Sequence, residues 1–215
     1  SLPKEKNESP MLSLDKTKDP LALKEWLGEQ EGLLSFKLDG LTVVLTYQKG
    51  QLVKGITRGS GVIGEVITPN ARTFVNLPLK IDFQEEVIVR GEAVIRYSDF
   101  ERINSRLPET EARYKNPRNL CSGTVRQLNS RITAERKVHF YAFSLRKAGS
   151  LDFDNSREKQ MLWLKERGFE PVGYRKVRQE NLEEALEIFS REAAISDLPS
   201  DGLVLTLEDI RYGQS

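Results

Sequence analysis

One lysine, in the stretch SFKLDG, is the first residue whose position could carry chemistry. Lys37 lies between Phe36 and Leu38, two residues before Asp39, and it precedes the alternating run LTVVLTY. A strand lysine is commonly a solvated residue whose aliphatic stem covers apolar surface. A half-desolvated lysine can instead act as an amine nucleophile, which requires a neutral nitrogen. At this point both interpretations of Lys37 are open.

The composition limits which side chains could do that chemistry. The 215 residues include 33 Lys and Arg, 32 Asp and Glu, one cysteine (Cys121) and one histidine (His139). One cysteine allows no intrachain disulfide, and one histidine gives little support to a His/Cys zinc site or a Ser-His-Asp triad. The sequence therefore predicts chemistry by lysine, arginine, aspartate and glutamate, and it indicates no metal-ligating residues.

Hydropathy along the chain bears on location. No apolar run approaches the roughly 18 residues of a membrane span. The N-terminal stretch SLPKEKNESP is polar and charged, where a signal peptide would be apolar. We expect a cytoplasmic protein that has no membrane partner.

Positive charge is concentrated in one segment. Residues 113–137 contain seven basic side chains against one acid, Glu135. Within that segment, Arg118 and Arg126 lie among Asn, Ser and Gly residues in NPRNLCSGTVRQLNS. Forked guanidinium donors next to small residues suit contacts with a phosphate backbone, whereas a basic run can also be a solvated face. The segment predicts a polyanionic partner, with the solvated face as the alternative.

Two further motifs could face a nucleotide. TRGSGVIGEV places Gly59, Gly61 and Gly64 in the pattern G-x-G-x-x-G after an expected strand, but VITPNAR after it does not read as the helix of a dinucleotide site. The loop either lets the backbone turn or serves a nucleotide held by other residues. Glu92, beside Gly91 in VRGEA, could face a ribose or a metal, or it could be a solubilising charge on an edge strand.

Alternating apolar residues predict antiparallel strands. LTVVLTY and QLVKGIT read as a hairpin around Gly50, EVIVRGEAVI and VHFYAFSL as further strands, and SDGLVLTLEDI as the last strand. Asp201 and Gly202 repeat the Asp-Gly step that follows Lys37, so we expect these two elements to face each other across one cleft. The expected elements begin with strands, continue with helices inserted between strands and end with strands. This order predicts an α+β fold on antiparallel sheets.

Helix signals separate these strands. DPLALKEWLG predicts a helix with Asp19 as its N-cap, and NSREKQMLWLKERG predicts another. Capping boxes are expected at Ser98 with Glu101 and at Asn181 with Glu184. Residues 1–18 are interpreted as a linker and residues 19–215 as one domain.

The stretches FKLDG, TRGSGVIGE, VRGEAVI, NPRNLCSGTVRQL, FYAF and SDGLVL stand in one order. Together they resemble the adenylation domain of bacterial NAD-dependent DNA ligases. The resemblance implies the nucleotidyltransferase fold of ligases and capping enzymes. It also implies that Lys37 attacks an α-phosphate and carries AMP, which would be transferred to the 5′-phosphate of nicked double-stranded DNA in replication and repair.

The resemblance also implies roles for other residues. Asp39 would support the lysine, and Arg58 and Glu92 would contact the sugar and phosphate side of AMP. Further nucleotide-binding positions are Leu38, Asp201 and Phe143, of which Phe143 would stack on adenine. Arg118 and Arg126 would grip the DNA backbone. NAD would be the adenylyl donor, and Mg²⁺ would offset charge on the phosphates.

Three positions depart from the family pattern. Ser35 stands where the family usually has a glutamate, Ser60 where it has an aspartate and Thr206 where it has a lysine. They leave a second interpretation, a catalytically impaired domain of the same fold that binds nucleotide or nicked DNA. A third is an RNA ligase or capping-type transferase that uses a triphosphate. We expect the domain to be truncated at its C-terminal end, with further ligase domains in the complete protein.

Overall fold

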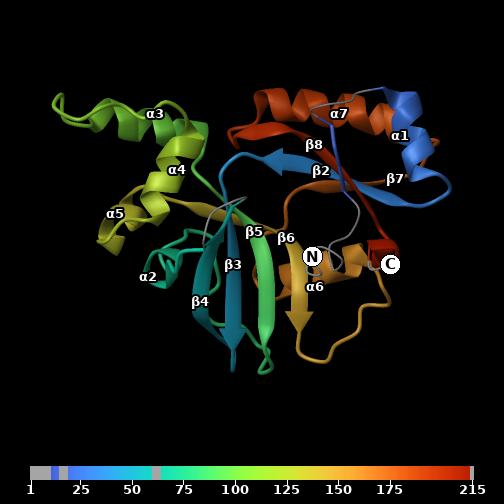
Figure 1. Ribbon diagram of the computed structural model, residues 1–215, viewed down its shortest axis with the longest axis horizontal. Coiled ribbons are helices and arrows are strands. Elements are labelled where there is room, and N and C mark those ends of the chain that lie inside the picture. The colour runs from blue at the N-terminus through green and yellow to red at the C-terminus, as the bar shows by residue number, and fades with distance from the viewer. Residues whose placement is uncertain (1–10, 15–18, 60–63, 214–215) are drawn as a thin grey trace.

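The computed structural model describes residues 11–14, 19–59 and 64–213 of the chain. These residues form two four-stranded sheets whose strands all pair antiparallel, with helices packed against them. In Figure 1 the strands of one sheet run across the view, and those of the other run down it. The predicted α+β class with antiparallel sheets is confirmed.

The first sheet carries the strand of Lys37. Its order is β1 (Met11–Ser13), β8 (Ser200–Leu207), β2 (Gly32–Leu38) and β7 (Tyr174–Val177). Helices α1 (Pro20–Leu27) and α7 (Leu182–Ile195) bury apolar residues against one face of this sheet, where Leu34 and Leu205 are fully buried. The alternate residues of β2 and β8 therefore point to the opposite face.

The second sheet begins directly after β2. Its order is β4 (Gln51–Arg58), β3 (Leu41–Gln48), β5 (Val87–Val94) and β6 (His139–Ala148). Strands β3 and β4 form the predicted hairpin, and its two turn residues, Lys49 and Gly50, have φ angles of 52° and 77°. Left-handed residues at both central positions fit the right-handed twist of the strands.

The other helices cover the second sheet or project from it. They are α2 (Thr68–Ala71), α3 (Tyr97–Arg106), α4 (Pro117–Val125), α5 (Ser130–Glu135), α6 (Arg157–Glu166) and the 3₁₀ turn η2 (Ile210–Gly213). Leu120, Cys121 and Val125 of α4 are fully buried in the core that this sheet shares with α2 and α6. In Figure 1, α3, α4 and α5 form an arm on one side of the molecule. This arm carries most of the basic segment.

Helix starts follow the sequence signals only in part. Asp19 caps α1 by accepting from the Leu21 amide, as predicted, and Ser156 caps α6 by accepting from the Lys159 amide. The expected capping box at Ser98 is wrong, because α3 begins at Tyr97 and Ser98 donates its amide and hydroxyl to Asp197 instead. The box at Asn181 is also wrong, since its side-chain oxygen accepts from the Arg178 amide.

The segment interpreted as a linker contains β1, which pairs with β8. The rest of that segment, residues 1–10 and 15–18, lies outside the described residues, as do Ser60 and Gly61 of the glycine loop. The division into residues 1–18 and 19–215 stays a prediction.

Gly91→Ala should destabilise the protein by about 1–3 kcal/mol, because overpacking in a filled core has this effect. A Cβ at Gly91 would lie 2.4 Å from Phe140 Cζ and 2.5 Å from the Tyr141 carbonyl oxygen. Urea unfolding measures the loss, with Gly59→Ala as the control because no described atom lies within 4 Å of a Cβ there. Equal unfolding free energies for the two variants would contradict this packing.

Candidate active site

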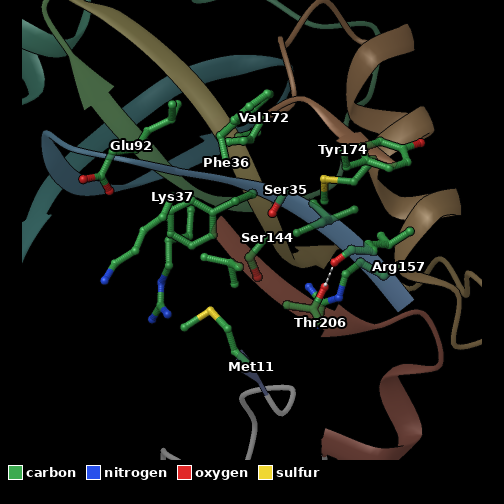
Figure 2. A pocket seen from close by; sticks show the side chains of 18 of the residues that line it. Met11, Ser35, Phe36, Lys37, Glu92, Ser144, Arg157, Val172, Tyr174 and Thr206 are labelled. Carbon is green, nitrogen blue, oxygen red and sulfur yellow. Dashed lines mark hydrogen bonds between the residues drawn. The ribbon is translucent and has the colours of Figure 1, made fainter. Parts of the chain in front are cut away.

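A cavity of about 720 Å³ lies where the two sheets meet. Its lining includes residues of all four strands of the first sheet, of β3, β5 and β6 of the second, and of α6. Figure 2 shows Lys37 and Glu92 toward one side of this cavity, with Thr206 and Arg157 at another. Small-molecule sites typically have volumes of roughly 300 to 1,000 Å³. The cavity is therefore large enough for a nucleotide.

Lys37 reaches this cavity because of strand alternation. Leu33, Ser35 and Lys37 are two residues apart along β2, and all three line the cavity. The Lys37 ammonium donates to the Ser13 hydroxyl of β1 over 3.2 Å. Lys37 is thus a half-buried residue that lines a cavity, rather than a lysine that lies fully in solvent.

The chain passes from the first sheet to the second directly after Lys37. At this crossing the Glu92 carboxylate of β5 accepts from the Gly40 amide at 3.0 Å and from the Thr42 hydroxyl at 2.9 Å. A Cβ at Gly40 would lie 1.9 Å from the Ala93 carbonyl oxygen, so only glycine fits there. Glu92 therefore fixes the backbone that positions Lys37.

Burial controls the protonation of Glu92. Desolvation raises the pKa of its carboxyl from 4.5 to about 7, against the lowering effect of the hydrogen bonds from Thr42 and Gly40. Asp39 raises this pKa further, and Arg118 lowers it. The site therefore contains a carboxyl group that titrates near neutral pH.

Asp39 lies between the cavity and the arm. Its carboxylate is 3.7 Å from the Arg118 guanidinium of α4. Burial raises the pKa of Asp39, Arg118 and Lys37 lower it, and the nearby Asp201 raises it. Asp201 itself is exposed at the start of β8.

The two Asp-Gly steps do not face each other as predicted. Leu38 pairs with Ser200, so β2 and β8 are neighbours in one sheet. Their antiparallel pairing places the end of one strand beside the start of the other. The expectation of two facing elements is wrong, although residues of both strands line the same cavity.

One part of the cavity is apolar. Phe143 and Leu38 line it together with Val172, and all three belong to one cluster with Val94. An aromatic ring and aliphatic side chains can pack on the faces of a purine. The predicted positions Leu38 and Phe143 therefore lie where a base could bind. Phe143 is on β6, at the opposite edge of its sheet from β4, the strand that precedes the glycine loop.

Three arginines also line the cavity, and sequence analysis missed all of them. They are Arg90 of β5, Arg146 of β6 and Arg157 of α6. Arg90 is two residues from Glu92 on the same strand, which was a signal that could have revealed it. Together with Lys37 they give the cavity four cationic side chains, which suit the phosphates of a nucleotide.

Other predicted residues lie outside this lining. Arg58 is exposed at the end of β4, opposite Thr42. Arg126 follows α4, where it pairs with Glu65 at 3.0 Å and donates to the Ser122 carbonyl at 2.9 Å. Arg118 and Arg126 therefore share the arm, while neither is among the described residues that line the cavity.

Two departures from the family pattern, Ser35 and Thr206, line the cavity. Ser60 lies outside the described residues. Within the described ranges, we find no group of three or more His, Cys, Asp or Glu side chains placed to hold a metal ion. The helices of those same ranges include none that is long and apolar enough to span a membrane.

Residues 1–215 match the sequence model of a family described as NAD-dependent DNA ligase adenylation domain. A DNA ligase of Ruminiclostridium cellulolyticum is 60% identical over 215 residues, which are 100% of this chain and 33% of that ligase. A DNA ligase of Lachnoclostridium phytofermentans is 56% identical over 214 residues, with 100% of this chain and 33% of that ligase covered. The chain spans about a third of the length of these curated relatives.

The fold is similar to that of solved ligases. An archaeal ATP-dependent RNA ligase (form 1) aligns with a TM-score of 0.51 and 16% identity, covering 89% of this chain and 43% of that one. At this identity the likeness concerns the fold alone. It agrees with the predicted nucleotidyltransferase fold.

Glu92→Gln should remove a pH dependence from the unfolding free energy. Because the pKa of Glu92 is raised from 4.5 to about 7, the folded protein holds this proton more tightly than the unfolded chain. Wild-type stability should therefore fall by up to about 3 kcal/mol as the pH rises through that range. Urea unfolding at a series of pH values measures the difference between the two curves.

Glu86→Gln is the matched control for this experiment. Glu86 is only partly exposed, with 32% of its side chain accessible, and hydrogen bonds from Gln48 and Lys147 lower its pKa. Its substitution should leave the decline near neutral pH unchanged. Parallel curves of unfolding free energy against pH for the wild type and Glu92→Gln would contradict the assignment of this decline to Glu92.

Proposed function

The chain belongs to the family of NAD-dependent DNA ligase adenylation domains, and from this premise we propose that Lys37 receives AMP from NAD. The observation that carries the proposal is the position of Lys37. Its amine enters a nucleotide-sized cavity that has an apolar part and three further cationic side chains. Such a cavity favours a purine and its phosphates over an uncharged ligand.

The first step is the attack of the neutral Lys37 amine on the α-phosphorus of NAD. A nitrogen–phosphorus bond forms, the bond to the bridging oxygen breaks, nicotinamide mononucleotide leaves, and the amine loses its proton. The bound geometry makes this an intramolecular reaction, and the cations of the cavity stabilise charge that develops on the phosphates. The AMP held on Lys37 is then transferred to a 5′-phosphate at a nick, and the 3′-hydroxyl seals the strand with release of AMP.

Other site residues would position the reactants. Glu92 holds Gly40 and Thr42, and through them the strand end that carries Lys37. Phe143 and Leu38 would pack on adenine, while Arg58 would contact the sugar and phosphate side. Mg²⁺ would supply further positive charge at the phosphates. The negative charges of Asp39 and Asp201 repel each other. A Mg²⁺ ion beside these two carboxylates would relieve that repulsion.

Nicked double-stranded DNA is the proposed second substrate, in replication and repair. Arg118 has a side chain that is 64% exposed, and it pairs with Asp39 of the nucleotide site. Its place on the arm would let one residue contact both the DNA backbone and the adenylated site. The expected cytoplasmic location and the further ligase domains belong to the same proposal.

A second candidate function is a domain that binds nucleotide or nicked DNA without catalysis. Ser35 and Thr206 favour it, because both are neutral residues inside the cavity. It differs from the first candidate in one outcome, since such a domain would never carry AMP on Lys37.

Lys37→Arg should abolish a covalent AMP adduct in the complete protein. Arginine keeps the positive charge but supplies no neutral amine near neutral pH. Intact-mass measurement after incubation with Mg²⁺ and either NAD or ATP, followed by peptide mapping, detects the adduct. Lys54→Arg, an exposed position on β4, is the control and should keep it. No adduct in the wild type would favour the non-catalytic function, and an adduct in Lys37→Arg would place the nucleophile elsewhere.

Arg118→Ala combined with Arg126→Ala should weaken binding of nicked duplex DNA by the complete protein. Each lost phosphate contact lowers the log-log salt slope by about 0.9, so the double variant should lose about 1.8. Titrations at several salt concentrations measure the slope. Arg191→Ala on α7, away from the arm, is the control. An unchanged slope in the double variant would remove the DNA-gripping role.

A further inference from the structure

Arg157 is held in a defined place at one end of the cavity. It is the first residue of α6, its amide donates to the Glu208 carbonyl at 2.9 Å, and its Nε donates to the Leu207 carbonyl at 3.4 Å. The Glu208 side chain also accepts from the Glu158 amide at 2.6 Å, which ties the start of α6 to the end of β8. Figure 2 shows the guanidinium of Arg157 beside Thr206.

Strand register shows in which direction Arg157 lies from the Lys37 amine along the cavity. The Lys37 amine contacts Ser13, which pairs with Val204, whereas Thr206 pairs with Met11. Two residues along a strand span roughly 6.5–7 Å. Thr206 and the nearby Arg157 therefore lie one such step further along β8 than Val204, beside which Ser13 holds the Lys37 amine, and this is a direction in which the phosphates of a diphosphate could extend.

We propose that Arg157 binds the phosphate that departs with the leaving group of the adenylyl donor. The identity of the donor rests on the proposed function, in which Lys37 attacks the α-phosphate. A diphosphate seated with its first phosphate at Lys37 would place its second phosphate toward Arg157 and Thr206. The guanidinium fork can donate two hydrogen bonds to that group and stabilise its negative charge as the bridging bond breaks.

This assignment gives a cationic function to a side chain that the sequence pattern did not mark. Thr206 is a neutral residue at a position where the family pattern has a lysine. Arg157 comes from a different element, yet it brings a positive charge to the same part of the cavity. The ligand chemistry is a diphosphate attached to adenosine, which both NAD and ATP contain.

The affinities of the complete protein for AMP and ADP test the role of Arg157. Wild type should bind ADP more tightly than AMP, because only ADP has the second phosphate. Arg157→Ala should lose roughly 10- to 100-fold in ADP affinity, the usual range for a hydrogen bond to a charged group, with AMP affinity unchanged. Lys159→Ala is the control on the same helix, since Lys159 pairs with Asp154 outside the cavity. An ADP preference that survives in Arg157→Ala overturns the proposal, as does its absence from the wild type.

A compensating substitution sharpens the test. Thr206→Lys in the Arg157→Ala background should restore the preference for ADP, because it returns an ammonium group to the same region. A double variant that binds AMP but lacks that preference contradicts the placement. Repeating the titrations with NAD and with ATP identifies the donor whose leaving phosphate Arg157 binds. Arg157→Ala should weaken binding of that donor more than binding of the other nucleotide. A wild type that binds neither AMP nor any of these nucleotides instead refutes the proposed function.

Discussion

The hydrogen bonds that Glu92 accepts from Gly40 and Thr42 hold the crossing segment between the two sheets against the second sheet, at the point where the site is built. The chain leaves the first sheet after Leu38 and enters the second at Leu41, so two residues must make the crossing. Gly40 approaches the Ala93 carbonyl too closely for any side chain. A short crossing held by one carboxylate leaves β2 little freedom to slide. The backbone of Lys37 is consequently held close to the second sheet, whose strands β3, β5 and β6 also line the cavity.

Local charge placement, rather than total charge, gives the cavity its positive character. The sequence has a formal net charge of only +1, yet Lys37, Arg90, Arg146 and Arg157 all line one cavity. The carboxyl group in that lining is Glu92, whose raised pKa makes it partly neutral near pH 7. A second basic region lies on the arm. Its Arg118 pairs with Asp39, which lies beside the cavity two residues after Lys37. This arrangement couples electrostatically the surface proposed for DNA to the site proposed for the nucleotide.

Sequence patterns predicted the features that depend on neighbours along the chain. Alternation located β3, β5, β6 and β8, and the turn at Gly50 identified the hairpin. The patterns failed where a distant residue competes, as when Asp197 takes the Ser98 hydroxyl that was expected to cap α3. The short edge strands β1 and β7 were missed because three or four residues carry no clear period. Arg157 was missed for a different reason, since only the tertiary fold brings α6 beside β8.

Ser35 and Thr206 are neighbours on one face of the first sheet, so the electrostatic effects of their two departures from the family pattern are considered together. Ser35 pairs with Val204, so Thr206, two residues further on β8, is its diagonal neighbour on the face that lines the cavity. Diagonal neighbours lie about 7–8 Å apart, within reach of long side chains. Where the family pattern has a glutamate and a lysine, removal of one partner would leave an unpaired charge in a half-buried site, which is strongly unfavourable. Removal of both leaves the net charge of the cavity unchanged and can be nearly neutral in stability. By this argument the two hydroxyl residues are compatible with an intact nucleotide site.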